Sequence, residues 1–169
     1  MPVLKVAAAN AQLALPEVQA VETSQASVMN VGEDIILFNK TGSSITHQNF
    51  KTDGEIAMVR GKLDLDFAAV YKATELTYNQ INYVRTDGVT NIVIGISEDS
   101  YHLTIGNESI GKSNAAATVT LGGLIPRGTY RFTDNGTNQG FFIASENGFY
   151  ALDTALDRKH VYKIDYIAH

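Results

Sequence analysis

The chain has 169 residues, a formal net charge of −5 and no cysteine. This length fits one domain or two very small ones, and the absence of cysteine excludes disulfides, thiolate metal ligands and cysteine catalysis. The acidic balance argues against nucleic acid as a partner, and no apolar stretch approaches the roughly 18 residues of a membrane-spanning helix, so no membrane partner is expected.

Residues 1–30 form a segment of distinct composition, rich in Ala, Val and Gln and poor in charge. Pro16 interrupts the segment, which disfavours one continuous helix, and the segment is too apolar for a typical disordered tail. We therefore predict an extended N-terminal arm that lies on a partner chain. The alternative is a first strand and loop of the same domain. The apolar residues expected to bind the partner are Leu4, Val6, Leu13, Leu15, Val18 and Val21.

A β-hairpin pattern follows the arm, with the sequence VGEDIILFNKTGSSIT over residues 31–46. It has an apolar strand over 34–38, a tight turn over 39–42 and a β-branched return strand from Ile45. Because the first strand is a continuous apolar run, residues 35–38 are expected to be largely buried, with only partial alternation.

The arm and hairpin together resemble the opening of small structural proteins of tailed phages, of the capsid decoration or minor virion type. In those proteins an Ala-rich arm precedes a hairpin of the form Gly-x-x-Leu-Leu-x-Val-Lys-Asn-x-Gly-Ser-x-x-Thr-Val. The similarity covers about the first fifty residues. It implies a non-enzymatic virion protein that decorates or cements the capsid by binding the major capsid protein or another virion protein. Symmetric capsid positions favour a homotrimer.

Short β-like runs alternate with turn signals through the rest of the chain. Residues 62–67 alternate, which places Leu63, Leu65 and Phe67 on one face of a strand. Residues 67–74 could instead form one or two helical turns. Asp87-Gly88 is a hairpin signal between two further runs, at 76–85 and 89–96. The remaining expected strands are 55–59, 101–105, 117–121, 129–133, 140–144, 149–152 and 160–168.

Turn signals spaced by roughly eight to twelve residues are typical of β-sandwiches and barrels. We therefore predict an all-β protein, with a sandwich or jelly-roll-like β domain over residues 31–169 that follows the extended N-terminal arm. The region 106–115 is the one place where this domain could divide into two small β subdomains.

No catalytic, cofactor-binding or metal-ligating residues are predicted. The four histidines, His47, His102, His160 and His169, stand alone, without a second histidine at metal-ligand spacing. There is no Gly-x-Ser-x-Gly nucleophile motif either. The segment 134–138 is similar to the opening of a calcium loop but lacks the distal glutamate, and a glycine turn explains it.

Two alternative functions stay open. Asp64 and Asp66 on one strand face would lie roughly 6–7 Å apart, a spacing that a β-sandwich enzyme acting on polysaccharide could use, although the wet face of an edge strand is the commoner reason for such a pair. Tyr78, Tyr83 and Tyr101 could form a stacking platform in a glycan-binding tail or head-fibre module, although cross-strand packing accounts for them as well.

Overall fold

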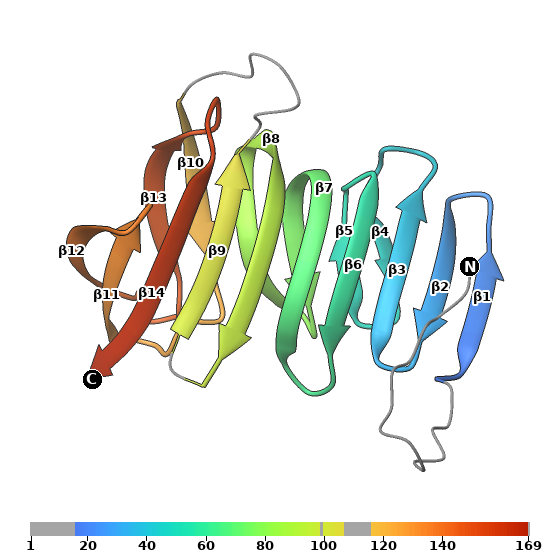
Figure 1. Ribbon diagram of the computed structural model, residues 1–169, viewed down its shortest axis with the longest axis horizontal. Helices are drawn as coiled ribbons and strands as arrows, with labels where there is room; N and C mark the ends of the chain where they lie inside the picture. The colour runs from blue at the N-terminus through green and yellow to red at the C-terminus, as the bar shows by residue number, and fades with distance from the viewer. Residues whose placement is uncertain (1–15, 99, 107–115, 169) are drawn as a thin grey trace, which may run out of the picture.

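The computed structural model describes residues 16–98, 100–106 and 116–168, and all regular structure in them is β (Figure 1). This confirms the predicted fold class. Within the described ranges, no helix is long and apolar enough to cross a membrane. The strands are β1 (Val18–Glu22), β2 (Ala26–Val31), β3 (Asp34–Asn39), β4 (Ile45–His47), β5 (Phe50–Thr52), β6 (Ile56–Gly61), β7 (Leu65–Tyr78), β8 (Ile81–Ser97), β9 (Ser100–Gly106), β10 (Ala116–Leu121), β11 (Thr129–Asp134), β12 (Thr137–Ile143), β13 (Tyr150–Ala155) and β14 (His160–Ala168).

The strands make a sandwich-like structure whose two layers belong to one antiparallel sheet that does not close into a barrel. The front layer in Figure 1 has the order β1-β2-β3-β6-β7-β8-β9-β14-β11-β12. Behind it lie β4, β5, β10 and β13, which pair with the far halves of β7 and β8 in the order β4-β5-β7-β8-β10-β13. The long β7–β8 hairpin is therefore shared by both layers.

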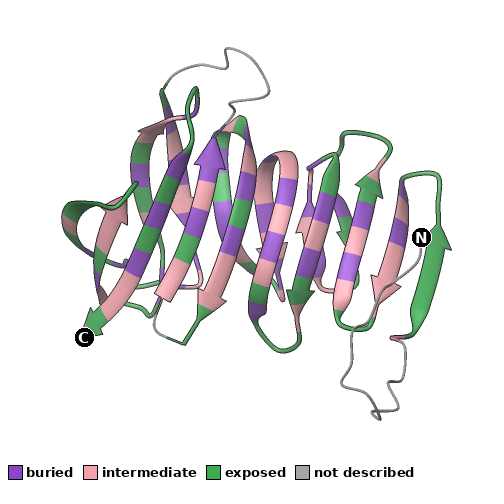
Figure 2. Ribbon diagram, viewed as in Figure 1, coloured by how far each residue is buried: buried purple, intermediate pink, exposed green. Residues whose placement is uncertain are grey.

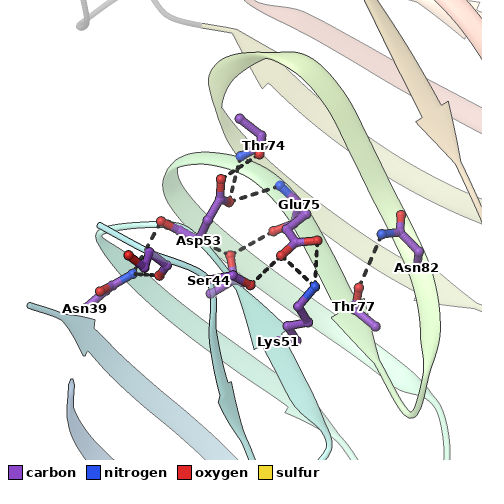
Figure 3. Close-up of polar contacts among 11 residues, drawn as sticks. Asn39, Ser44, Lys51, Asp53, Thr74, Glu75, Thr77 and Asn82 are labelled. Atoms are coloured by element: carbon purple, nitrogen blue, oxygen red, sulfur yellow. Dashed lines mark hydrogen bonds and ion pairs between the residues drawn. The ribbon is translucent and has the colours of Figure 1, made fainter. Parts of the chain in front are cut away.

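The hairpin passes from one layer to the other at a bend in β7. Ladder pairing between β7 and β8 shifts between Val70 and Glu75, and Lys72 within this stretch has a φ of +54°. The Asp53 carboxylate accepts the backbone N–H groups of Thr74 and Glu75 at 2.8 and 3.1 Å, and the Thr74 hydroxyl at 2.6 Å (Figure 3). Asp53 thus satisfies donors at the point where the regular ladder is interrupted.

A second carboxylate, that of Glu75, ties the back layer to this bend. Lys51 on β5 forms an ion pair with Glu75 at 2.9 Å, and the Ser44 hydroxyl donates to the same carboxylate (Figure 3). The Thr52 hydroxyl donates to the Glu75 carbonyl at 2.8 Å. Gly54 completes the corner, because a Cβ there would lie 2.2 Å from a Val70 methyl carbon.

The core lies between the two layers. Buried and more exposed residues alternate along the front strands, as Figure 2 shows, because successive side chains of a strand point to opposite faces. The fully buried large side chains include Leu37, Phe50, Leu65, Leu76, Tyr78, Ile92, Ile94, Leu103, Ile105, Tyr130, Leu156 and Ile164. At the C-terminal end, Phe142 stacks between Tyr130 and Tyr150, with ring centroids 5.3 and 3.8 Å away.

The predicted hairpin over residues 31–46 is wrong in its pairing, although its strand and its turn are present. Asn39 Oδ1 accepts the backbone N–H groups of Thr41 and Gly42 and shapes the turn. However, β3 pairs with β2 and β6, whereas β4 pairs with β5 in the other layer. The expectation that residues 35–38 are largely buried with only partial alternation is also wrong: burial alternates along β3, with Ile35 and Leu37 buried, Ile36 half-buried and Phe38 45% exposed.

The expected hairpin turn at Asp87-Gly88 lies inside β8 instead. The chain reverses at Asn79-Gln80, where both residues have positive φ, +47° and +66°, as a two-residue hairpin turn requires. Asp87 accepts the backbone N–H of Thr118 at 2.9 Å. Asp87-Gly88 therefore lies where β8 passes between the layers rather than where the chain turns back.

Two smaller expectations around β7 are corrected. Residues 67–74 belong to a strand and not to a helix, because they pair with β6 and β8 on either side. Leu63 does not share a strand face with Leu65: Leu63 precedes β7 and is 84% exposed, whereas Leu65 is buried.

The predicted boundary at residue 30 falls within β2, whose Ala26 and Val28 belong to the core. Residues 18–31 form the β1–β2 hairpin at the edge of the sheet, which matches the alternative reading of this part of the arm. Residues 1–15 and most of the region 106–115 lie outside the described residues. The strands on either side of that second region, β9 and β10, both pair with β8.

We expect Asp53→Ala to lower the free energy of unfolding by about 1–3 kcal/mol, because the donors at the β7 bend lose their acceptor. Urea unfolding followed by circular dichroism measures the change. Asp66→Ala is the matched control, because Asp66 is an exposed aspartate on β7, the strand whose bend Asp53 contacts. Equal effects of the two substitutions would contradict the proposed role of Asp53.

Candidate functional site

A row of side chains crosses the outer face of the front layer over eight strands. Residues opposite one another in a ladder point to the same face of a sheet, and the register links one residue from each strand. This apolar row contains no charged residue and one polar residue, a threonine. Its members, in order, are Ala20, Met29, Ile36, Met58, Ala69, Val93, Thr104 and Val161.

A shorter apolar row runs beside it, with Phe38, Ile56 and Tyr71 opposite one another on β3, β6 and β7. Ile56 is 44% exposed, close to the value for Phe38. Between the longer side chains of Met58 and Val93, Ala69 has only a methyl group. A depression of about 340 Å³ therefore opens at this point, and both rows contribute to its lining. We call it the Ala69 depression.

Ion pairs border this apolar surface at both ends of the strands. Each pair joins two residues of this chain, so the charges of the border are already neutralised. One of them, Arg60 with Asp34, is bidentate at 2.6 and 2.9 Å, and the hydrogen bond to Glu33 raises the pKa of Lys62. An apolar centre with a polar rim is the usual anatomy of a protein interface. The pairs are Asp34–Arg60 and Glu33–Lys62 at one end, and Glu22–Lys40 and Glu55–Lys72 at the other.

Among the strands that the structure describes, the front layer ends at β1 and β12, which form its two edges. All five residues of β1 are exposed. On β12, Phe141 and Ile143 are 65% and 66% exposed. An edge strand presents unpaired backbone groups that can accept a strand from another chain. Both edges are therefore candidate contact sites.

A polar pocket of about 420 Å³ lies at the C-terminal end of the sandwich, lined by residues of β11, β13 and β14. In its wall the buried His160 places Nδ1 2.8 Å from Asp134 Oδ2, and Arg158 Nε–H donates to Nε2 at 3.4 Å. The His160 ring stacks on Tyr162, whose hydroxyl forms a 2.7 Å hydrogen bond with the Thr154 hydroxyl. Burial raises the pKa of the Tyr162 phenol.

In the wall of this pocket the hydrogen bond between His160 and Asp134 links β14 to β11. Because Arg158 donates to Nε2, the Nδ1 proton is directed at Asp134, and both ring nitrogens are engaged. The hydroxyl of Thr154 is also engaged, by Tyr162. Across the described ranges, no three His, Cys, Asp or Glu side chains lie close enough together to hold a metal ion.

The chain matches no protein-family profile. A comparison with curated protein sequences likewise finds no match. Inference about function therefore depends on the surfaces of this structure and on the sequence patterns.

The two alternative sites suggested by the sequence are not assembled in the structure. Asp64 precedes β7 whereas Asp66 lies on it, so they do not share a strand face as predicted, and both are exposed. Tyr78 and Tyr83 are core residues, 2% and 4% exposed. The Tyr101 hydroxyl donates to the Gly123 carbonyl. The prediction of a stacking platform is therefore wrong, because these tyrosines pack inside the sandwich.

The predicted arm residues divide into two groups. Leu4, Val6, Leu13 and Leu15 lie outside the described residues. Val18 and Val21 lie on β1, where they are 51% and 42% exposed, and they pair with Val31 and Val28 of β2 respectively. Being three residues apart on a strand, they point to opposite faces of the sheet.

We expect Asp134→Ala to destabilise the fold by about 1–3 kcal/mol, because the Nδ1–H group of buried His160 loses its acceptor. Thermal or urea unfolding measures the change. The control is Asp157→Ala, which alters an exposed aspartate in the turn before β14. If Asp134→Ala is no more destabilising than the control, the pair does not hold the two strands together.

Proposed function

We propose that this chain is a non-enzymatic structural protein of a tailed-phage virion, which decorates or cements the capsid by binding the major capsid protein or another virion protein. The observation that carries the proposal is the exposed apolar surface on the front layer, with its border of internally paired charges. Contiguous apolar surface of this kind is typical of protein interaction sites. The resemblance of the first fifty residues to phage decoration proteins suggests that the partner is a virion protein.

Cementing requires contacts that bridge neighbouring capsid subunits. Open strand edges are suited to this, because they add backbone hydrogen bonds to a partner strand. The exposed Phe141 and Ile143 on β12 supply apolar area beside one edge, worth about 25 cal/mol per Å² buried. Modest binding per copy is sufficient, because repetition in a homotrimer and over a symmetric shell provides avidity.

The two alternatives have less support. A glycan-binding module needs exposed aromatic rings, and two of the three candidate tyrosines are in the core. A polysaccharide-acting enzyme needs paired carboxylates in a cleft. Asp64 and Asp66 are exposed, and neither lines the polar pocket at the C-terminal end.

We expect the double substitution Asp64→Asn with Asp66→Asn to change the free energy of unfolding by no more than about 0.5 kcal/mol, as is usual for exposed positions. It should also leave attachment to phage particles unchanged. Both effects can be measured on the purified variant. Glycan cleavage by the wild-type protein that disappears in this variant would contradict the non-enzymatic proposal.

We expect deletion of residues 2–15 to preserve the β fold and to abolish attachment to particles. Every described strand begins after Pro16, so the sheet keeps all its pairs, whereas the apolar segment that we expect to contact a neighbouring chain is lost. Circular dichroism and urea unfolding check the fold, and co-sedimentation with capsids checks attachment. Unfolding of the truncated protein, or full attachment by it, would contradict the arm's role.

A further inference from the structure

We propose that residues 2–15 of a neighbouring copy of this chain lie across the apolar row on the outer face of the front layer, with one apolar side chain seated in the Ala69 depression. The partner is thus a second copy, and the contact is an exchange of N-terminal segments between copies. The proposal does not depend on the virion function, because it concerns only how the chain associates with itself, and it leaves the β12 edge with the exposed Phe141 and Ile143 to a virion partner.

The shape of the apolar row favours a long, narrow partner segment. The apolar row spans eight strands, and seven intervals of about 4.8 Å give it a length of about 34 Å. Over β1 to β7 it is bordered along both sides by the ion pairs at the strand ends. Adjacent strands also rotate relative to one another by about 20–25°, so the row follows a twisted surface. A flexible extended segment can follow that twist more easily than a rigid flat face can.

The charge pattern identifies the chemistry of the occupant. The four ion pairs of the border are closed within the chain, so they offer no unpaired charge to attract a charged partner. The best partner is apolar and nearly uncharged. Residues 2–15 have the sequence PVLKVAAANAQLAL, with Lys5 as the single charged side chain and Val3, Leu4, Val6, Leu13 and Leu15 as the larger apolar side chains.

The length and the attachment point of this segment also fit. Fourteen extended residues reach about 46 Å at about 3.3 Å per residue, which exceeds the length of the row. The segment joins the sheet at Pro16, near Gly32 in the β2–β3 turn. A residue that precedes proline favours an extended conformation, which suits a segment that lies extended along the row.

The test is the oligomeric state of the purified full-length chain, measured by analytical ultracentrifugation. We expect an oligomer that dissociates on deletion of residues 2–15 and on Ala69→Arg, which fills the depression with a charged side chain. Ile125→Lys, at a position 38% exposed that lies outside the rows, is the matched control and should leave the oligomer intact. Circular dichroism checks that each variant folds. If Ala69→Arg does not fold, Val93→Lys tests the same row at a residue that is already 37% exposed.

A labelled peptide of residues 1–16 gives a second readout. It should bind the truncated protein saturably, and at least about tenfold more weakly when Ala69→Arg is also present. A monomeric full-length chain would overturn the proposal. If the truncated protein nevertheless binds the peptide, the segment covers its own sheet and not a neighbour's. The proposal would also be overturned if the oligomer stayed intact after the deletion and after the substitutions in the row. Capsid attachment is not used as a readout, so failure of the virion proposal leaves this result unaffected.

Discussion

The architecture depends on the satisfaction of backbone donors where β7 bends. A sheet can contribute to both layers of a sandwich only if a strand leaves one ladder and enters another, and its N–H groups need acceptors at that point. Asp53 supplies them for Thr74 and Glu75, and Gly54 allows the neighbouring segment to approach Val70 closely. Through this corner, a single hairpin fixes the position of both layers.

The two faces of the front layer have different roles as a result. Its inner face packs against the shorter back layer and contains the core. Its outer face has no covering layer among the described residues, yet β3, β6 and β8 place Ile36, Met58 and Val93 there. Polar residues would be expected on a solvated face of an antiparallel sheet. The apolar row therefore departs from the composition of a solvated sheet face, and ion pairs closed within the chain border it.

Local sequence signals predicted the fold class and several turns, but not the pairing. The glycine turn expected within residues 134–138 is present at Asn135-Gly136, where both residues have positive φ, +48° and +80°. Asp87-Gly88 carries an equally strong local signal, yet its conformation is set by a distant partner, Thr118. For β3 the local pattern predicts a hairpin with the run that follows it, whereas the strand pairs with the preceding β2 across the turn at Gly32 and, on its other side, with β6. The contact at Asp87 and the pairing with β6 are long-range, and a short window of sequence does not contain them.

The candidate surfaces also depend on contacts between residues far apart in the sequence, so local sequence signals do not reveal them. His160 looked isolated because its partner Asp134 lies 26 residues earlier, and only the ladder between β11 and β14 brings them together. The apolar row takes one residue from each strand, so no single strand reveals it. The centre of the apolar row can be recognised once the pairing register of β3, β6 and β7 is known, because the register places Ile36, Met58 and Ala69 side by side.

The shared hairpin has a consequence for the order of folding. The turn at Asn79-Gln80 closes a loop of only two residues, so β7 and β8 can pair at low cost in loop-closure entropy. Both layers then grow by adding strands to a template that already exists, whereas β14 must find β9 across a much longer stretch of chain. Contacts between residues close in sequence form fastest. The element that divides the sheet between two layers is therefore also the natural nucleus for assembling them.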